Sequence, residues 1–339
     1  MTIQTAWLGL FGLLFVGYLI MDGRTIGAGL ALPVLGRDAA ERSTVVHAVG
    51  PYFLANEVWI IAALGLLVGG FPIFEGTMLS GLFPFFIPFV VAMGLRGVSF
   101  HFRLRESAPG WRRLWESVLT FACLIQAVAW GFIGSLMFHA LPLGDDEVLR
   151  VPASLLAEPF TIVCVCASIA VFALHGTNFV AARLAGPLSN RAVALAKKLG
   201  PAALLTVALS VIAGLFTDGV KDVVGHPRLV IGLVVLGVIG TVLSDVANYG
   251  GKPQLAFVGS SIVLVTAAFI VGAGRLPYLI VSSHGERQSM TVTEGAAEAS
   301  VLHPLFWMVL VLLPVLIAAQ FMTWRIARGR VREGSVGYF

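Results

Sequence analysis

The chain has 339 residues, of which 58% are hydrophobic and only 12% are charged, and its mean hydropathy is +0.92. Charged residues make up about a quarter of an ordinary soluble domain, and a soluble fold of this length cannot bury so much apolar surface. The composition therefore excludes a soluble catalytic domain and predicts a protein whose solvent is the lipid bilayer. The net charge of +4 encodes orientation in such a protein, not nucleic-acid binding.

Long, continuous apolar runs recur along the whole chain. Helices are the default spanning element, because every backbone polar group must be hydrogen-bonded within the segment, whereas a barrel shows short alternating strands. The sequence predicts an all-α, polytopic membrane protein with about nine transmembrane helices. The predicted spans are residues 5–23, 52–74, 78–99, 116–140, 154–180, 199–217, 228–247, 254–275 and 303–325.

A faint internal repeat suggests how these spans are organised. Gly50-Pro51 opens the second span and Gly200-Pro201 opens the sixth, each after an arginine-containing loop. This pattern predicts two four-helix bundles plus one extra helix, a common arrangement in membrane proteins. The predicted units are 1–141 (spans one to four), 150–280 (spans five to eight), an outer loop at 281–302, and the last span with its tail at 303–339.

The 22 lysine and arginine residues are divided unequally between the two sets of alternate loops. Most lie in one set, and Arg96 lies inside a span. The other set holds Arg150, Lys221, Arg228, Arg275 and Arg287. Basic loops remain in the cytoplasm, so the N-terminus is predicted outside and the C-terminus in the cytoplasm.

Few ionisable side chains fall within the spans, where each is costly and often functional. Asp22 ends the first span, Asn56 and Glu57 open the second, and Arg96 ends the third, all on the predicted cytoplasmic side. Two interpretations stay open. These residues form a polar pocket that passes protons or pairs with a partner subunit, or they form a buried ion pair, Arg96 with Glu57 or Asp22, that fixes helix packing.

Histidines and cysteines give no pattern of a metal centre. His139 and His175 are the histidines nearest to helix interiors, and no two histidines occupy matched depths in facing spans, as haem ligation requires. The three cysteines lie in apolar runs without zinc-site spacing. The prediction is a chain that ligates neither haem nor metal and has no catalytic residue of its own.

Several motifs resemble those of one membrane-protein family along most of the chain. The chain resembles subunit II of cytochrome bd-type quinol oxidases. The matching stretches are Gly17-Tyr18 with Asp22-Gly23, Gly27 and Gly29; Gly50-Pro51 with Asn56-Glu57-Val58-Trp59; Arg96 to Arg103 with Trp111 to Trp115; and His175-Gly176-Thr177, Leu276-Pro277-Tyr278, Ser282-Ser283, Ser289 to Thr291 and Leu313-Pro314.

The resemblance implies a role in a bacterial terminal oxidase of the cytoplasmic (inner) membrane, which reduces O₂ to water with electrons from a quinol. It implies that haem b and haem d are held by subunit I, and that subunit II scaffolds subunit I. Some members also hold a structural quinone, and a small single-span subunit is a further expected partner, beside membrane lipid and quinol. Nucleic acid is not an expected partner. The resemblance further implies that subunit II lends acidic residues to a cytoplasmic proton path.

The chain departs from the family pattern in that proton path. Leu54 stands where an acid is expected at the start of span two, Thr25 follows Asp22-Gly23-Arg24 where a second acid is expected, and His101 replaces an acid after Phe100. The proton-path candidates are therefore Asp22, Glu57 and His101, with Asn56, Arg96 and Trp59 as a structural polar cluster. Two alternatives remain: a divergent paralogue with only an assembly role, and a secondary transporter.

Overall fold

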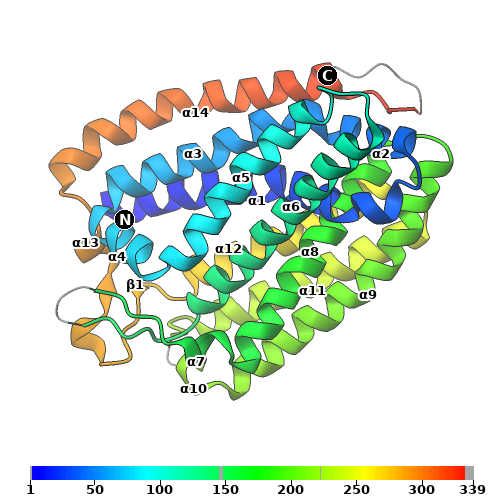
Figure 1. The fold of residues 1–339 in the computed structure, drawn as a ribbon. Helices are drawn as coiled ribbons and strands as arrows, with labels where there is room; N and C mark the ends of the chain where they lie inside the picture. Colours follow the sequence, from blue (N-terminus) through cyan, green and yellow to red (C-terminus); the bar gives the residue numbers. More distant parts are fainter. Residues whose placement is uncertain (1, 145–147, 222, 333–339) are drawn as a thin grey trace.

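The computed structural model describes residues 2–144, 148–221 and 223–332, and its long helices run side by side (Figure 1). Within this part of the chain, nine helical segments are long and apolar enough to cross a membrane. They are α1 (Ile3–Leu35), α2 (Ala39–Val49) joined to α3 (Phe53–Gly70) through the 3₁₀ turn η1 (Gly50–Tyr52), α5 (Phe83–Phe102), α6 (Pro109–Leu136), α8 (Pro159–Arg183), α9 (Pro187–Phe216), α11 (Pro227–Tyr249), α12 (Pro253–Ala273) and α14 (Ala299–Ala327).

Short elements connect these helices, and several lie near the end of the molecule where α1 begins (Figure 1). The two strands pair antiparallel, with Tyr278 opposite Thr291. The short elements are α4 (Pro72–Gly81), α7 (Ala153–Leu156), α10 (Asp218–Lys221), β1 (Tyr278–Ile280), η2 (Glu286–Gln288), β2 (Met290–Thr291) and α13 (Val292–Gly295).

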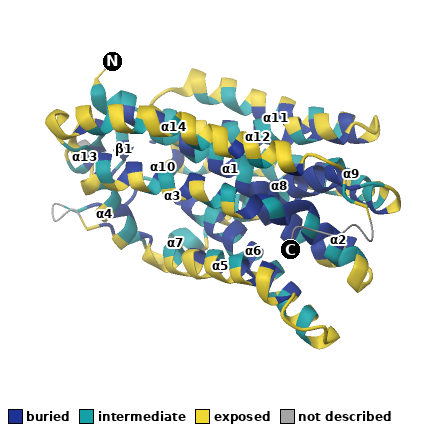
Figure 2. Ribbon diagram, turned by 90° about the horizontal axis from the view of Figure 1, so that it is seen from above, coloured by how far each residue is buried: buried dark blue, intermediate teal, exposed yellow. Residues whose placement is uncertain are grey.

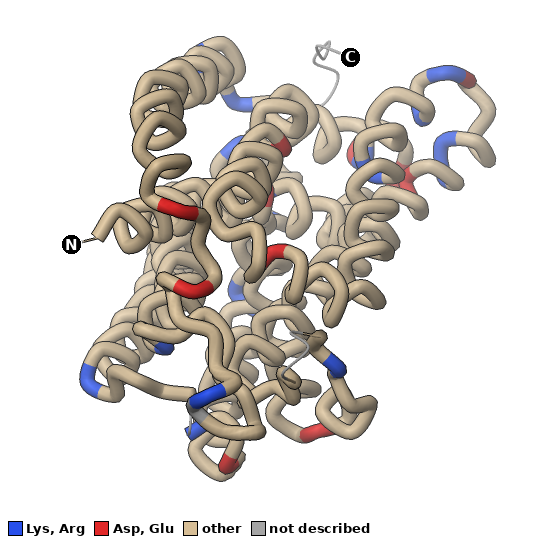
Figure 3. Tube along the Cα trace, turned by 90° about the vertical axis from the view of Figure 1, so that its left-hand side faces the viewer, with Lys and Arg blue, Asp and Glu red and all other residues tan. Residues whose placement is uncertain are grey.

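The prediction of an all-α architecture is confirmed, with nine membrane-length helices in the described part of the chain. α1 begins and α14 ends at opposite ends of the molecule (Figure 1), as an odd number of crossings requires. Figure 3 shows that charged residues are sparse along the trace and gather in loops and at helix ends. The part of the predicted tail at 333–339 lies outside the described residues.

Several helices are longer than the predicted spans, because helical hydrogen bonding continues beyond the apolar run. The first span was predicted at 5–23, yet α1 continues to Leu35, and the sixth was predicted at 199–217, yet α9 begins at Pro187. Arg24, which follows the predicted first span, is a buried helical residue with 4% of its surface exposed.

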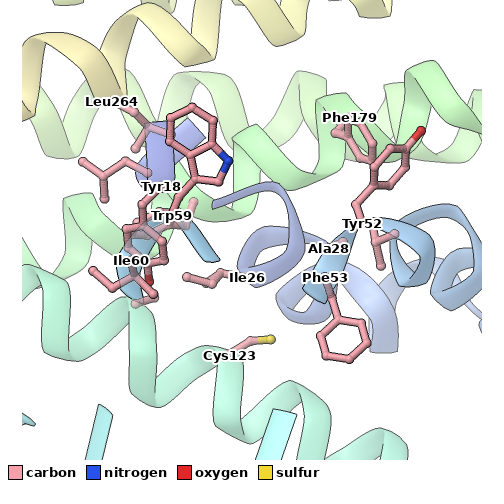
Figure 4. Close-up of a cluster of buried hydrophobic side chains, with 14 of the residues drawn as sticks. Tyr18, Ile26, Ala28, Tyr52, Phe53, Trp59, Ile60, Cys123, Phe179 and Leu264 are labelled. Carbon is pink, nitrogen blue, oxygen red and sulfur yellow. The ribbon is translucent and has the colours of Figure 1, made fainter. Parts of the chain in front are cut away.

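α1 lies at the centre of the packing and touches α3, α6, α8 and α12. Helices of both predicted bundles therefore share one core around α1, and the division into two bundles stays a prediction. α14 lies on the outside, with Leu302, Gln320 and Ala327 as its buried residues, and is largely exposed in Figure 2. The aromatic and aliphatic side chains of the core are shown in Figure 4.

Two glycines allow α1 and α8 to cross with their backbones in contact. A Cβ atom on Gly27 would overlap the carbonyl oxygen of Phe172 and lie 2.6 Å from the amide nitrogen of Gly176. A Cβ on Gly176 would in turn overlap Gly27 and Ala28. Small residues at such crossings let transmembrane helices pack by van der Waals contact, so this pair holds the N-terminal helix against the second half of the chain.

Candidate functional site

Arg96 of α5 lies between two carboxylates from different helices. Its Nη2 is 2.8 Å from Asp22 Oδ2 of α1 and 3.0 Å from Glu57 Oε1 of α3. The side chains of Arg96 and Asp22 are fully buried, and 16% of the Glu57 side chain is exposed. The ion pairs proposed from the sequence are therefore present, and a single cation binds both acids.

Two buried aromatic residues lie one helical turn along the chain from members of the ion-pair cluster (Asp22, Glu57 and Arg96). Phe53 and Phe100, each next to a turn of the helices that carry Glu57 and Arg96, stack with ring centroids 4.7 Å apart. Both rings are buried. Charges in such an apolar setting are screened far less than surface charges, so the pairing of Arg96 with the acids is strongly coupled to helix packing.

Asn56 belongs to a different contact from the one expected. Its Oδ1 accepts a hydrogen bond from Arg24 Nη2 at 2.8 Å, and its Nδ2 donates to Thr25 Oγ1 at 3.0 Å. The Arg24 guanidinium lies over the rings of Tyr52 and Phe179, at 4.4 and 4.8 Å from their centroids, which are adjacent in Figure 4. Asp22 and Arg24, two residues apart, thus face different sides of α1.

Trp59 also stands apart from Arg96. Its indole Nε1 donates to Gln320 Oε1 of α14 at 3.2 Å, and Gln320 Nε2 lies 3.7 Å from Met21 Sδ. Asn56, Trp59 and Arg96 therefore take part in three separate polar contacts, where the sequence suggested one cluster: Asn56 joins α3 to α1, Trp59 joins α3 to α14, and Arg96 joins α5 to α1 and α3. Sequence spacing along a helix identifies buried faces, but it does not identify the partner helix.

His101 contacts an aromatic residue of α3. It is exposed near the end of α5, and its ring makes an edge contact with Phe53 at 5.8 Å between centroids. Phe53 and Phe100 lie buried at this level. Of the three proton-path candidates, Asp22 and Glu57 thus share one site, while His101 is at its periphery.

A second buried polar network escaped the sequence analysis. Asn178 of α8 donates through Nδ2 to Ser244 Oγ of α11 at 2.8 Å and to the Ala256 carbonyl of α12 at 3.1 Å. Asn248 donates to Asn178 Oδ1 at 2.9 Å. These residues are scattered through three apolar runs, and their only sequence signal is small polar residues inside predicted spans. The network joins three helices and has no charge.

The two buried histidines were tested as haem ligands. The imidazole of His175 uses both nitrogens, with Nδ1 2.9 Å from Ser260 Oγ and Nε2 3.0 Å from the Ile20 carbonyl. It also stacks on Phe257 at 4.5 Å. Nε2 of His139 lies 3.4 Å from Thr161 Oγ1 and 3.5 Å from Glu158 Oε2. Both ring nitrogens of His175 and Nε2 of His139 are thus engaged by protein groups, and the bonding of His175 does not fit haem ligation.

The described residues also contain no group of three His, Cys, Asp or Glu side chains that could hold a metal ion.

Beyond the end of α6, burial lowers the pKa of His139, an effect that the nearby Glu158 carboxylate only partly offsets. Arg275, beyond α12, donates to the carbonyls of Val271 and Met137, both at 2.9 Å, and burial lowers its pKa to about 10. These contacts are structural clamps at one end of the bundle.

At the other end of the bundle, some of the basic residues near the loop after α5 form ion pairs that hold helices together. Glu116 of α6 pairs with Arg42 Nε at 2.7 Å and with Arg103 Nη2 at 3.0 Å. Glu41 pairs with Arg191 at 2.6 Å. Part of the positive charge that predicts orientation is therefore also used to join α2, α6 and α9.

Comparison with known proteins identifies the family. The model of the family described as cytochrome bd terminal oxidase subunit II matches residues 3–327. The chain belongs to this family. The resemblance found in the sequence is thereby confirmed, and the chain is a subunit of an oxidoreductase complex, the haem-containing bd-type terminal oxidase, together with subunit I.

Individual relatives of this bd oxidase subunit II agree over nearly the whole length. Cytochrome bd ubiquinol oxidase subunit 2 of Bacillus subtilis is 28% identical over 97% of both chains. Cytochrome bd-I ubiquinol oxidase subunit 2 of Escherichia coli is 24% identical and covers 97% of this chain and 95% of its own. A chain in the structure of bd oxidase from Geobacillus thermodenitrificans has the same fold, with a TM-score of 0.76 at 14% identity, covering 96% and 98% of the two chains.

The apolar helices and the bacterial relatives together support a multi-pass protein of the bacterial inner membrane. The orientation of the termini rests on the arginine and lysine distribution alone and stays a prediction.

Proposed function

We propose that this chain is the haem-free scaffold of its oxidase and that the cluster of Asp22, Glu57 and Arg96 takes part in proton uptake from the cytoplasm. The haems b and d then belong to subunit I, and the reducing substrate is a quinol, as the names of the Bacillus and Escherichia relatives state for those proteins. The bonding of both ring nitrogens of His175 supports haem ligation elsewhere in the complex.

The observation that carries the proton proposal is the charge count of the buried cluster. Two carboxyl groups share a single guanidinium at 2.8 and 3.0 Å. An isolated charge in a low-dielectric interior is strongly disfavoured, so these three groups taken alone reach neutrality when they hold one proton. Arg24, the next buried cation along α1, is bonded to Asn56 instead. A site that gains and loses a proton in this way is suited to relay protons consumed in O₂ reduction.

The entry to this site differs from the family pattern. Leu54 is 62% exposed on α3, one helical turn before Glu57, so the position of the missing acid faces outward from this chain. Glu57 is the partly exposed member of the cluster and is the proposed first acceptor, with Asp22 behind it. His101 is exposed on the same predicted cytoplasmic side and is proposed as an outer donor.

A hollow on the surface offers a place for the structural quinone that some family members hold. It lies between α5 and α6, has a volume of about 350 Å³ and is lined by apolar side chains, among them Phe85, Phe121 and Phe132. Its lining suits an isoprenoid chain and lacks polar groups for a redox-active ring.

A small single-span subunit is a further proposed partner. The transporter alternative is not proposed, since family and fold are those of an oxidase subunit.

The test is Asp22→Asn in the complete oxidase, with Asp245→Asn as the matched control. Asp245 also lies toward one end of a spanning helix, α11, and does not contact Arg96. Oxygen consumption with quinol is measured from pH 6 to 8 beside the haem spectrum. We expect slower turnover with an intact spectrum for Asp22→Asn and near-normal turnover for the control.

The assembly-only alternative makes a different prediction for the double variant Asp22→Asn, Glu57→Gln. If this variant assembles and retains full turnover across the pH range, the cluster has no proton role and the chain serves assembly alone. If turnover falls while both subunits and their haems remain, the relay proposal stands.

A further inference from the structure

Gln126 of α6 is a fully buried glutamine whose amide has no protein partner. None of its surface is exposed, and neither Oε1 nor Nε2 has a hydrogen-bond partner among the described residues. Gln320, the other buried glutamine discussed above, is bonded to Trp59 at 3.2 Å. Buried polar side chains in native proteins are nearly always bonded to protein or to ordered water, so Gln126 requires a partner that is not a protein group.

The register of α6 on α1 places Gln126 at the level of Asp22. Three contacts set this register, namely Thr120 Oγ1 to the Gly29 carbonyl at 3.0 Å, Cys123 Sγ to the Thr25 carbonyl at 3.9 Å, and Trp130 Nε1 to the Tyr18 hydroxyl at 3.1 Å. The two helices run antiparallel, so residues further along α6 contact residues earlier in α1. Gln126 lies three residues after Cys123 and four before Trp130, on the same helix face, and therefore opposite Asp22.

Buried hydrogen-bond donors and acceptors with unused bonding capacity lie together at the level of Asp22. Nε and Nη1 of Arg96 are buried donors without a hydrogen-bond partner, and the Asp22 carboxylate, which interacts with Arg96 Nη2 and the Tyr18 hydroxyl, still has acceptor positions left. Together with the Gln126 amide, they bring surplus donors and acceptors from α1, α5 and α6 to the same level. A water molecule both donates and accepts, and buried waters typically make about three hydrogen bonds to such groups.

We infer that Gln126, Asp22 and Arg96 form a binding site for buried water, placed where α1, α5 and α6 meet. A small cavity lies next to this level of the bundle. It has a volume of about 10 Å³, is lined by residues of α1, α2, α5 and α6, and includes Thr25 and Gly29, one and two turns beyond Asp22. A volume near 10–15 Å³ is about what one water requires. Room for about one water thus exists one to two helical turns from Asp22, toward the predicted cytoplasmic end, although Asp22, Arg96 and Gln126 do not themselves line this cavity.

The water site extends the proposed proton relay but does not depend on it. In a chain with Leu54 and Thr25 where acids are expected, bound water supplies the donor next to Asp22 that an acidic side chain supplies elsewhere. The hydration itself is measured independently of turnover, so failure of the relay proposal and failure of the water proposal are separate results.

The first test is a structure of the wild-type complex at a resolution that shows ordered water. We expect water density at hydrogen-bond distance, about 2.7–3.2 Å, from the Gln126 amide and from Asp22 or Arg96. Direct bonds from the Gln126 amide to Asp22 or Arg96, with no water between them, would overturn the inference.

The second test compares Gln126→Leu with Gln320→Leu by infrared spectroscopy of the complex in H₂¹⁶O and H₂¹⁸O. Both changes remove a buried amide, but only Gln126 is assigned to water. We expect bands of bound water that shift with ¹⁸O in the wild type and in Gln320→Leu and that are lost in Gln126→Leu. Retention of every such band in Gln126→Leu contradicts the assignment. Should Gln126→Leu fail to assemble, the wild-type structure alone decides.

Discussion

Removal of the Arg96 guanidinium tests the central contact of the structure. The change Arg96→Ala leaves the carboxylates of Asp22 and Glu57 without their shared cation, which now lies 2.8 and 3.0 Å from them. Asp22 has no exposed surface, so bulk solvent cannot reach its carboxylate, and a buried neutral water does not replace the lost positive charge. The variant is expected to be produced in much lower yield as an assembled complex.

The magnitude follows from the burial of the pair. Breaking a buried ion pair by removing one partner costs about 3–5 kcal/mol, which corresponds to roughly two to four powers of ten in the ratio of folded to unfolded protein. Membrane proteins as well as soluble ones have small net stabilities compared with such a loss. The same reasoning predicts rescue, since replacing a whole buried ion cluster by neutral groups is often tolerated.

The assay is thermal stability of the detergent-solubilised complex, followed by size-exclusion chromatography with haem absorbance. The rescue variant combines Arg96→Met with Asp22→Asn and Glu57→Gln, and the control is Arg105→Ala, an exposed arginine just beyond α5. We expect a large loss for Arg96→Ala, substantial recovery in the combined variant and little change in the control. Wild-type stability of Arg96→Ala, or no recovery on neutralising the acids, would refute the reasoning.

Two further predictions concern packing and pH. Gly27→Ala forces a methyl group into the backbone of α8 and is expected to destabilise the complex by about 1–3 kcal/mol, measured by thermal unfolding. The control Gly12→Ala, on the same helix, places its methyl group where nothing lies within 4 Å, and stability should be unchanged. Equal effects of the two substitutions would contradict the close crossing of α1 and α8. Because burial lowers the pKa of His139, its stabilising contribution is present above the ordinary histidine pKa of about 6.5 and is lost as pH falls toward the lower folded value. The wild type should thus lose more stability between pH 7.5 and 5.5 than His139→Gln, and parallel losses would count against this.

Much of the fold could be predicted because hydropathy measures transfer into lipid, which is the dominant constraint on spanning helices. The nine helices and the pairing of Arg96 with Asp22 or Glu57 follow from the rarity of charge in such segments. Helix ends could not be predicted as well, since backbone hydrogen bonding carries α1 to Leu35 and hides Arg24 inside the helix. An apolar run shows which part of a helix lies in lipid, but it does not show at which residue the helix ends.

The composition of the site was predicted less completely than the fold. Asn56 and Trp59 were expected beside Arg96 but bond instead to Arg24 and Gln320, because the partner of a buried side chain depends on tertiary packing. The Asn178 network and the unpartnered amide of Gln126 involve neutral residues, which carry no charge signal in an apolar run. Their importance becomes visible only when burial and hydrogen bonds are known.

The most direct test of the proposed function is purification of the tagged chain from its native membranes, followed by a visible difference spectrum of the dithionite-reduced minus the oxidised preparation. The account predicts that a larger hydrophobic partner co-purifies, that b- and d-type haem bands appear, and that the haem remains with the partner when the two chains are separated. A chain that is isolated alone and colourless in the mildest detergent, or one that retains haem after separation, would contradict it.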